Sequence, residues 1–440
     1  MPDVLSFGAR GDGVSLDTRA IQDAINAGGV VNFPPGVYRT GTIYLRSNGG
    51  LHLENGAVIL GSSNPDDYNP DDFCPQNRVF ASEHVSGAHL VVAVEQENIS
   101  LSGPGCIDGN RQEIFGAEKL NPARQSHFDY PRWRPGQMLF FCECRNLSIE
   151  GVELRNATYW HSFYHGCEDV RIRGLYIHSD LRTPTNDGID LDCCQRVVVS
   201  DCLISTGDDC LTLRGNVLPL KKPRVCRDIT VSNCVFQTAT CAIRVGVGRG
   251  EIRDCRIADI VVRDSSRGIC ICPLFSQGYT SIENISFCNF TIDAKFPLYI
   301  TSNWRGEVHD PEARTVQDLY FRNIQARARG GNLIVGNSCG KMRGLTFSDL
   351  DIILQDCQAD PELDYRDAAT IWQKRLSAAP ATALYIAHQR NLALRNVRVR
   401  QGENCRGFRH DAAFVDSPGA KLENCLFPGG MYQDGSLDRP

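Results

Sequence analysis

The chain has 440 residues, with 46 Lys and Arg against 52 Asp and Glu, for a formal net charge of -6. Both signs are mixed along the sequence, which argues against nucleic acid or an anionic membrane as the main partner, and no stretch is apolar enough to span a bilayer. No basic and then apolar segment opens the chain, so we expect a cytoplasmic protein.

The first predicted element is a short helix over residues 17–25. Asp17 stands at the N-cap, and Ile21, Ala24 and Ile25 follow at helical spacing. We expect this helix to close the N-terminal end of the fold, within a cap formed by residues 1–30.

A repeated pair of short strands dominates the rest of the chain. The unit apolar-x-apolar-x-polar-x-x-apolar occurs at 147–152, 170–175, 197–202 and 229–234, and continues at 285–287, 319–321, 345–347 and 392–394. Second strands are expected at 188–192, 210–214, 242–246, 268–272, 297–301 and 332–336. Their starts are 22, 32, 26, 29 and 35 residues apart.

This irregular spacing predicts one coil per repeat with loops of variable length. We therefore expect an all-β fold, a single-stranded right-handed parallel β-helix. A β-propeller is the alternative, and it would need a more regular period. Residues 361–378 indicate a helical excursion within an insertion at 355–380. No linker is visible, so residues 1–440 are expected to form one domain.

The 20 cysteines are interpreted as reduced packing thiols. Cys202, Cys234, Cys255, Cys288 and Cys425 recur beside strand starts, where a thiol acts as a small apolar side chain. Bracketing disulfide spacings and paired CxxC motifs are absent from the sequence, so neither a disulfide framework nor a zinc finger is expected. We expect no metal and no cofactor.

Alternation of side chains along the second strands predicts the floor of a groove. The outward residues are Asp190, Asp192, Thr212, Arg214, Arg244, Cys270, Cys272, Tyr299 and Thr301. Asp187, Asp208 and Asp209 stand at the heads of two successive strands, so they are expected together at its edge. Splitting a glycosidic bond with water needs a protonated carboxyl as acid and a carboxylate to activate water. Alternatively, these aspartates bond to turn backbones.

The pair of motifs resembles glycoside hydrolase family 28, the polygalacturonases and their relatives. Thr185-Asn186-Asp187-Gly188 keeps the aspartate and glycine of the family's Asn-Thr-Asp-Gly, and Gly207-Asp208-Asp209 follows at the family spacing. The resemblance runs from about Asp3 to Trp304 and includes residues 7–13, 33–38 and 156–161. It implies inverting hydrolysis of an oligosaccharide or polysaccharide, with Asp208 as general acid and Asp187 and Asp209 activating the water.

Four positions on the following coils depart from the family pattern. Cys241 replaces the histidine of Gly-His-Gly, and Cys270-Ile271-Cys272 replaces the Arg-Ile-Lys that binds the galacturonate carboxylate. Trp304 stands at the tyrosine position, where it could stack on a sugar. Thiols cannot replace charge-assisted bonds to a carboxylate. A neutral sugar at the cleaved residue, carboxylate binding by Arg244 or Arg214, and saccharide binding without hydrolysis all stay open.

Aromatic and basic residues near the aspartates are further candidates. Trp160 is expected to bind substrate, and His161 and His165 are expected either to line a subsite or to have a structural role. Trp133 and Arg134 are candidates for a wall, together with the insertions at 110–135 and 216–223, and a blocked groove would favour exo action. A calcium-dependent lyase with an arginine base and a binding or structural β-helix are the competing functions. The oligomeric state is left open.

Overall fold

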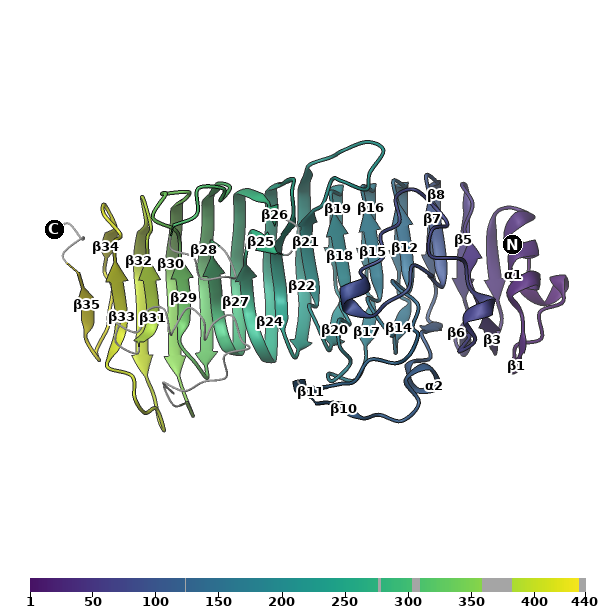
Figure 1. Cartoon of the computed structure of the whole chain (residues 1–440), viewed down its shortest axis with the longest axis horizontal. Coiled ribbons are helices and arrows are strands. Elements are labelled where there is room, and N and C mark those ends of the chain that lie inside the picture. Colours follow the sequence, from purple (N-terminus) through teal and green to yellow (C-terminus); the bar gives the residue numbers. More distant parts are fainter. Residues whose placement is uncertain (123, 276–277, 303–308, 358–381, 435–440) are drawn as a thin grey trace. The chain divides into compact units, whose positions relative to one another are not determined.

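The computed structural model describes residues 1–122, 124–275, 278–302, 309–357 and 382–434, which form two compact units. Unit 1 comprises Met1–Thr212 and Val217–Cys234, and unit 2 comprises residues 213–216 and those after 234. The division falls inside β21 (Leu211–Gly215) and β22 (Cys226–Thr238). Stacked coils of parallel strands make up each unit (Figure 1).

The strands of unit 1 pair in parallel, coil upon coil, in three columns. The first column is β4 (Ile43–Tyr44), β7 (Val91–Val94), β12 (Leu139–Cys142), β15 (Ser162–His165) and β18 (Ile189–Asp192). The second is β2 (Val30–Phe33), β5 (Gly49–Leu53), β8 (Glu97–Ser102), β13 (Arg145–Glu150), β16 (Glu168–Arg173), β19 (Gln195–Ser200) and β22. The third is β1 (Asp12–Leu16), β3 (Gly36–Thr40), β6 (Ala57–Gly61), β9 (Cys106–Asp108), β14 (Glu153–Arg155), β17 (Tyr176–His178) and β20 (Leu203–Thr206).

Unit 2 repeats this pairing with longer strands. One column is β23 (Cys241–Gly248), β24 (Glu251–Ile271), β27 (Ser281–Thr301), β29 (Asn332–Val335), β31 (Thr382–Ala387), β33 (His410–Val415) and β35 (Met431–Gln433). The other runs from β24 and β27 to β28 (Val316–Ala328), β30 (Met342–Leu354), β32 (Ala393–Gln401) and β34 (Lys421–Glu423). The predicted right-handed parallel β-helix is confirmed.

Short elements outside the columns lie at the N-terminal end and in the connections. They are the 3₁₀ helices η1 (Val4–Phe7), η2 (Pro65–Asp67) and η3 (Ala81–Glu83), helix α2 (Arg111–Phe115), and the hairpins β10 (Leu120–Asn121) with β11 (Arg124–Phe128) and β25 (Leu274–Phe275) with β26 (Gly278–Tyr279). None of the helices in the described ranges is long and apolar enough to cross a membrane.

The predicted N-terminal helix is present as α1 (Thr18–Asn26), at the end of unit 1 that carries the N-terminus (Figure 1). Ile21, Ala24 and Ile25 are buried, and the helix contacts η1, β2 and β4. Asp17 precedes the helix but makes no capping bond, because its carboxylate accepts the N–H groups of Arg10 and Gly11. The predicted excursion at 361–378 lies outside the described residues.

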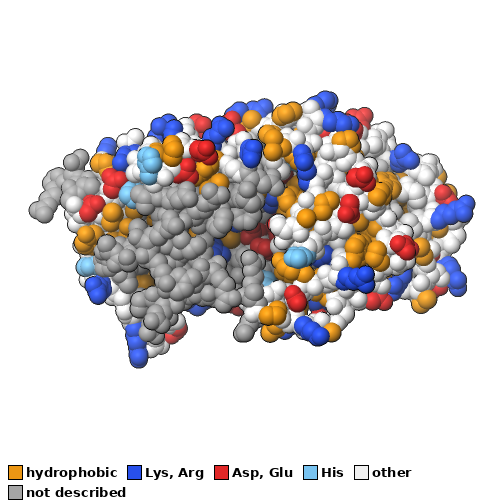
Figure 2. All heavy atoms as spheres, in the orientation of Figure 1, with side chains coloured by type: hydrophobic (Ala, Val, Ile, Leu, Met, Phe, Trp, Pro, Cys, Tyr) orange, Lys and Arg blue, Asp and Glu red, His pale blue; other side chains and the backbone are white. Residues whose placement is uncertain are grey.

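Identical positions of successive coils stack in register. In unit 2 the ring of Phe321 lies between those of Phe287 and Phe347, with centroids 5.0 and 4.5 Å away. At the turns, asparagine and aspartate side chains with positive φ bond from coil to coil, as in Asn284 to Asp254 at 2.7 Å. On the face in Figure 2, acidic and basic side chains are interspersed.

All 20 cysteines are free thiols and 15 of them are buried, which confirms the packing interpretation. A ladder of thiols that the repeat did not reveal runs through unit 1. Each donates to the carbonyl at the preceding coil: Cys144 to Ala93, Cys167 to Phe141, Cys194 to Tyr164 and Cys226 to Leu191, at 3.1 to 3.5 Å. Buried carbonyls need such donors, so these thiols stabilise the turns as well as filling space.

We predict that Phe321→Ala lowers the free energy of unfolding by about 3–5 kcal/mol, because a buried ring stacked on two neighbours is lost. Tyr320→Ala is the matched control, since this adjacent side chain is 44% exposed and should change the value by under about 0.5 kcal/mol. Urea titration followed by circular dichroism measures both. Equal losses would contradict the assigned core.

Candidate active site

The three candidate aspartates lie on successive coils of unit 1. Asp187 ends the turn formed by residues 184–188, here called the Asp187 turn, which leads into β18. Asp208 and Asp209 precede the next strand, and the amide of Gly188 donates to Asp209 O at 2.8 Å. Because paired strands are about 4.8 Å apart, this bond places the carboxylates one coil from each other. Asp187 and Asp209 are 5% and 7% exposed, and Asp208 is half-buried.

Two glycines allow this close approach. A Cβ on Gly188 would lie 2.5 Å from Cys210 O, and one on Gly207 would lie 2.0 Å from Thr183 O. Neither position has room for a side chain, so the glycine of each motif sets the spacing between the coils that carry the aspartates.

His161 and Asn186 hold the backbone of the Asp187 turn from inside. The Nδ1–H of His161 donates to Asp187 O at 2.8 Å, and its Nε2 lies 3.0 Å from Ser179 Oγ. Asn186 Nδ2 donates to Ala157 O and Tyr159 O at 2.7 and 2.9 Å. His161 is fully buried, so it fixes the turn and does not line a subsite. Burial lowers the pKa of His161 to about 4, so the ring is neutral.

The outward face of unit 1 changes from apolar to acidic at β18. One row runs from Val92 through Phe140 and Phe163 to Asp190, and the next runs from Val94 through Cys142 and His165 to Asp192. Both aspartates point outward as predicted and are buried, at 0% and 1% exposure. The acidic side chains of these two rows are therefore in β18, the strand that follows the Asp187 turn.

Residues 62–90, here called the covering segment, pack on the apolar part of these rows. The ring of Phe73 lies 5.8 Å from that of Phe140, and His89 stacks on Phe140 at 4.3 Å. The ring centroid of Phe80 lies 5.8 Å from that of Trp160, and the Trp160 side chain is only 4% exposed. Trp160 is thus a floor residue beneath the covering segment, and not an open sugar platform.

Arg134, but not Trp133, differs from the predicted wall. Trp133 packs on Tyr68 with ring centroids 5.3 Å apart, so it does contact the covering segment. Arg134 is fully buried, with its guanidinium beside the Asp187 turn. A buried side chain cannot form a groove wall, so this expectation was wrong for Arg134.

His165, Asp192 and Cys193 bring one ligand atom each within 4.8 Å of one another. His165 Nε2 lies 3.9 Å from Asp192 Oδ2. All three side chains are buried, and Cys193 belongs to the apolar cluster that includes Leu220 and Phe140. Zinc accepts these ligand types. The group is assembled from two coils, so it leaves no CxxC pair in the sequence.

In unit 2, Cys270, at one of the family's cation positions, lies on an outward row that is apolar beyond Arg244. Register places Cys270 beside Arg244 on one side and Tyr299 on the other, and the row continues through Leu333 and Tyr385. Cys241, Cys270 and Cys272 are each 2% exposed and pack in one cluster with Tyr299. Arg214, in β21, is 8% exposed. Trp304 lies outside the described residues.

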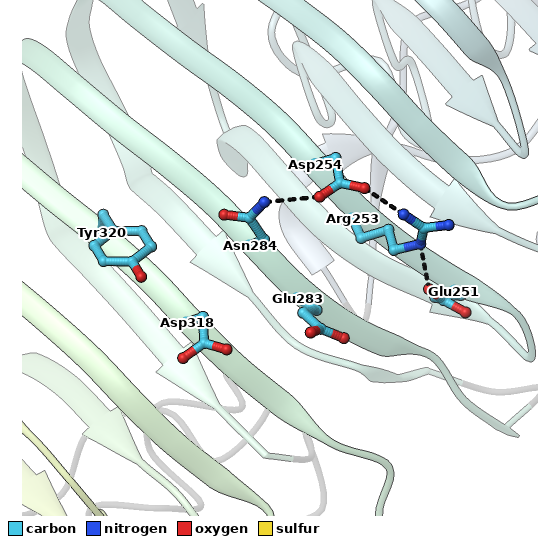
Figure 3. A pocket seen from close by; sticks show the side chains of 7 residues that line it. All are labelled: Glu251, Arg253, Asp254, Glu283, Asn284, Asp318 and Tyr320. Atoms are coloured by element: carbon cyan, nitrogen blue, oxygen red, sulfur yellow. Dashed lines mark hydrogen bonds and ion pairs between the residues drawn. The ribbon is translucent and has the colours of Figure 1, made fainter.

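A polar depression on unit 2 gathers other acidic residues (Figure 3). Its lining is Glu251, Arg253, Asp254, Glu283, Asn284, Asp318 and Tyr320. Arg253 pairs with both Glu251 and Asp254, and Asn284 bonds to Asp254 from the next coil. No candidate site residue lines it. The ion pairs of Arg253 are local to β24, and the bond from Asn284 to Asp254 is one of those that join successive turns.

Comparison with known families assigns the chain. The model of "Glycosyl hydrolases family 28" matches residues 76–361, more than half of the sequence. The chain belongs to this family. It is therefore a glycoside hydrolase of a polygalacturonase-like, inverting family. A second model, "Rhamnogalacturonase A/epimerase, pectate lyase-like", matches residues 2–80.

Similar proteins include a probable polygalacturonase of Vitis vinifera, 24% identical over 80% of this chain and 74% of the relative. An exo-poly-alpha-D-galacturonosidase of Dickeya chrysanthemi is 27% identical over 49% of this chain and 42% of that protein. Among solved structures, the family 28 exopolygalacturonase of Yersinia enterocolitica has a TM-score of 0.67 at 18% identity, covering 97% of this chain and 78% of that one. The last similarity concerns the fold.

We predict that His161→Gln makes stability less sensitive to acid. The unfolded histidine takes up a proton below about pH 6.5, whereas the buried ring resists protonation until about pH 4, so wild-type stability falls as pH falls through this window. The variant should melt lower at pH 7 and lose less between pH 6.5 and 4. Melting temperatures across this range test it, and parallel curves would contradict the buried neutral histidine.

Proposed function

We propose that this family 28 hydrolase cleaves a pectin-related oligosaccharide with inversion, through Asp187, Asp208 and Asp209. The bond from Gly188 to Asp209 carries the proposal, because it fixes Asp187 and the Asp208–Asp209 pair on neighbouring coils. Inverting sites hold acid and base about 6.5–9.5 Å apart, which a diagonal between coils can supply. Asp208, the most exposed of the three, is the general acid, and Asp187 and Asp209 activate the water.

We further propose a neutral sugar, such as a rhamnosyl or galactosyl residue, at the cleaved position. The positions of the family's two carboxylate-binding cations hold Cys270 and Cys272, which are buried in an apolar cluster. Burial raises the pKa of Cys272 to about 11, so the thiol carries no charge. Carboxylate binding by Arg244 or Arg214 is the second candidate, and activity on galacturonosides would favour it.

Exo action is supported by the covering segment. Its rings pack on Phe140 of β12, and Phe80 packs on Trp160, which lies one coil before the Asp187 turn. A sugar chain cannot continue across side chains packed on the strands. Relatives named as exopolygalacturonases agree with this proposal. The 20 free thiols support action in a reducing compartment, the cytoplasm, on short saccharides.

We predict that Asp208→Asn lowers kcat by about 10²–10⁴-fold, because the leaving group loses its proton donor. Asp201→Asn is the matched control, since this exposed aspartate of the same unit pairs with Arg173 and Asn233. Rates are measured on aryl glycosides and on pectic, rhamnose-containing and galactan oligosaccharides, and NMR reports the anomer formed first.

Retention of configuration, or full activity of Asp208→Asn, would refute the assigned roles. Loss of activity with chelator together with an ultraviolet-absorbing unsaturated product would instead indicate a lyase. If the wild type binds these saccharides but cleaves none, the binding function is favoured.

We predict that the first product released from a long substrate is a single terminal unit. In this proposal the covering segment, which packs on Phe140 and Trp160, stops the substrate chain from extending beyond the cleaved end. Chromatography of early digestion products tests this, with an endo-acting family member as the control. A ladder of mixed oligomers at low conversion would exclude exo action.

A further inference from the structure

Arg134 donates all five of its guanidinium N–H groups although it is fully buried. The bonds run from Nε to His84 O at 3.1 Å, from Nη1 to Thr158 O at 2.6 Å and Pro184 O at 3.1 Å, and from Nη2 to Glu83 O at 2.6 Å and Thr185 Oγ1 at 2.7 Å. The acceptors come from three separate segments of unit 1, so this one side chain ties them together.

Aromatic rings and one carboxylate compensate the buried charge. The guanidinium carbon lies 5.0 Å from the ring centroids of both Tyr130 and Tyr159, a cation–π geometry on each. The Tyr159 hydroxyl bonds to the Glu83 carboxylate. Burial lowers the pKa of Arg134 to about 10, which keeps the group charged at neutral pH. The cation is therefore held by a built site.

Two of the three acceptor segments have different tasks. Glu83 and His84 lie in the covering segment, where Ser86 also bonds to Arg134 O through its amide and hydroxyl. Pro184 and Thr185 belong to the Asp187 turn. Thr185 has φ of 49°, a left-handed conformation that a β-branched residue adopts only under constraint. The bond from Arg134 to Thr185 Oγ1 supplies such a constraint.

We propose that Arg134 is a positioning residue that holds the Asp187 turn and the covering segment in one fixed geometry. This role rests on the proposed function of Asp187. Arg134 acts through the backbone of the turn and touches no reacting atom. Losing its bonds lets Thr185 relax and displaces Asp187, and a displacement near 1 Å in an active site costs about 100-fold in rate.

Arg134→Lys keeps the charge but offers only three donors on a flexible stem, so it cannot satisfy five fixed acceptors. We expect kcat to fall by about 100-fold, with a smaller change in KM. Arg111→Lys is the matched control, because Arg111, in α2, is 3% exposed, pairs with Glu118 and lies over the ring of Phe128. It should keep the wild-type kcat even if its melting temperature drops.

Hydrogen exchange measured by mass spectrometry tests the coupling without any substrate. In Arg134→Lys, peptides covering residues 78–86 and 183–188 should both exchange faster than in the wild type, whereas in Arg111→Lys they should not. Faster exchange at only one of the two segments, or at neither, overturns the proposal. A folded Arg134→Lys with wild-type kcat, or an equal loss in Arg111→Lys, also overturns it.

Kinetics and hydrogen exchange together distinguish failure of the Arg134 coupling from failure of the proposed hydrolase function. If the wild-type enzyme cleaves no oligosaccharide, the role of the aspartates fails, while paired exchange changes would still establish that Arg134 couples the segments. If the wild type is active and exchange is unchanged in Arg134→Lys, the coupling alone fails.

Discussion

Parallel backbone pairing between successive coils is the constraint on which the site depends. It sets a fixed distance from strand to strand, so that residues of different strands meet when they occupy the same position of the repeat. The Gly188 amide meets Asp209 O because both stand at the start of a coil. Glycine is needed at 188 and 207, since any Cβ there would enter the neighbouring backbone and force the coils apart.

The strands and the positions of the aspartates were predictable because both follow from the fixed spacing between coils. Alternation of apolar residues marks a strand, and strands at the same position of successive coils pair with each other. Asp190 and Asp192 could therefore be placed outward from the sequence alone. The covering segment was not predictable. Phe73 and Phe80 belong to an irregular stretch without periodicity, and what they contact is decided by tertiary packing onto Phe140 and Trp160.

Arg134 shows why a buried polar residue escapes sequence analysis. Arginine is usually exposed, and its neighbours Trp133 and Pro135 indicate a loop, so a surface wall was the natural interpretation. The burial of Arg134 depends on five hydrogen-bond acceptors in other segments, and none of these acceptors is unusual by itself. For His161 the sequence left both a subsite and a structural role open for the same reason, since its partners are a backbone carbonyl and Ser179.

Burying a cation at this place is costly, and the geometry explains why an apolar side chain is a poor substitute. Desolvation of a guanidinium costs several kcal/mol, and replacing buried ion pairs by apolar groups is often neutral or stabilising. Here, however, four of the five acceptors are main-chain carbonyls, which stay in place whatever stands at 134. Each would lose a donor at about 1–3 kcal/mol. The charge thus satisfies carbonyls of the coil that carries Trp160, of the Asp187 turn and of the covering segment together. These bonds fix the covering segment relative to the turn that carries Asp187, the residue proposed to activate water.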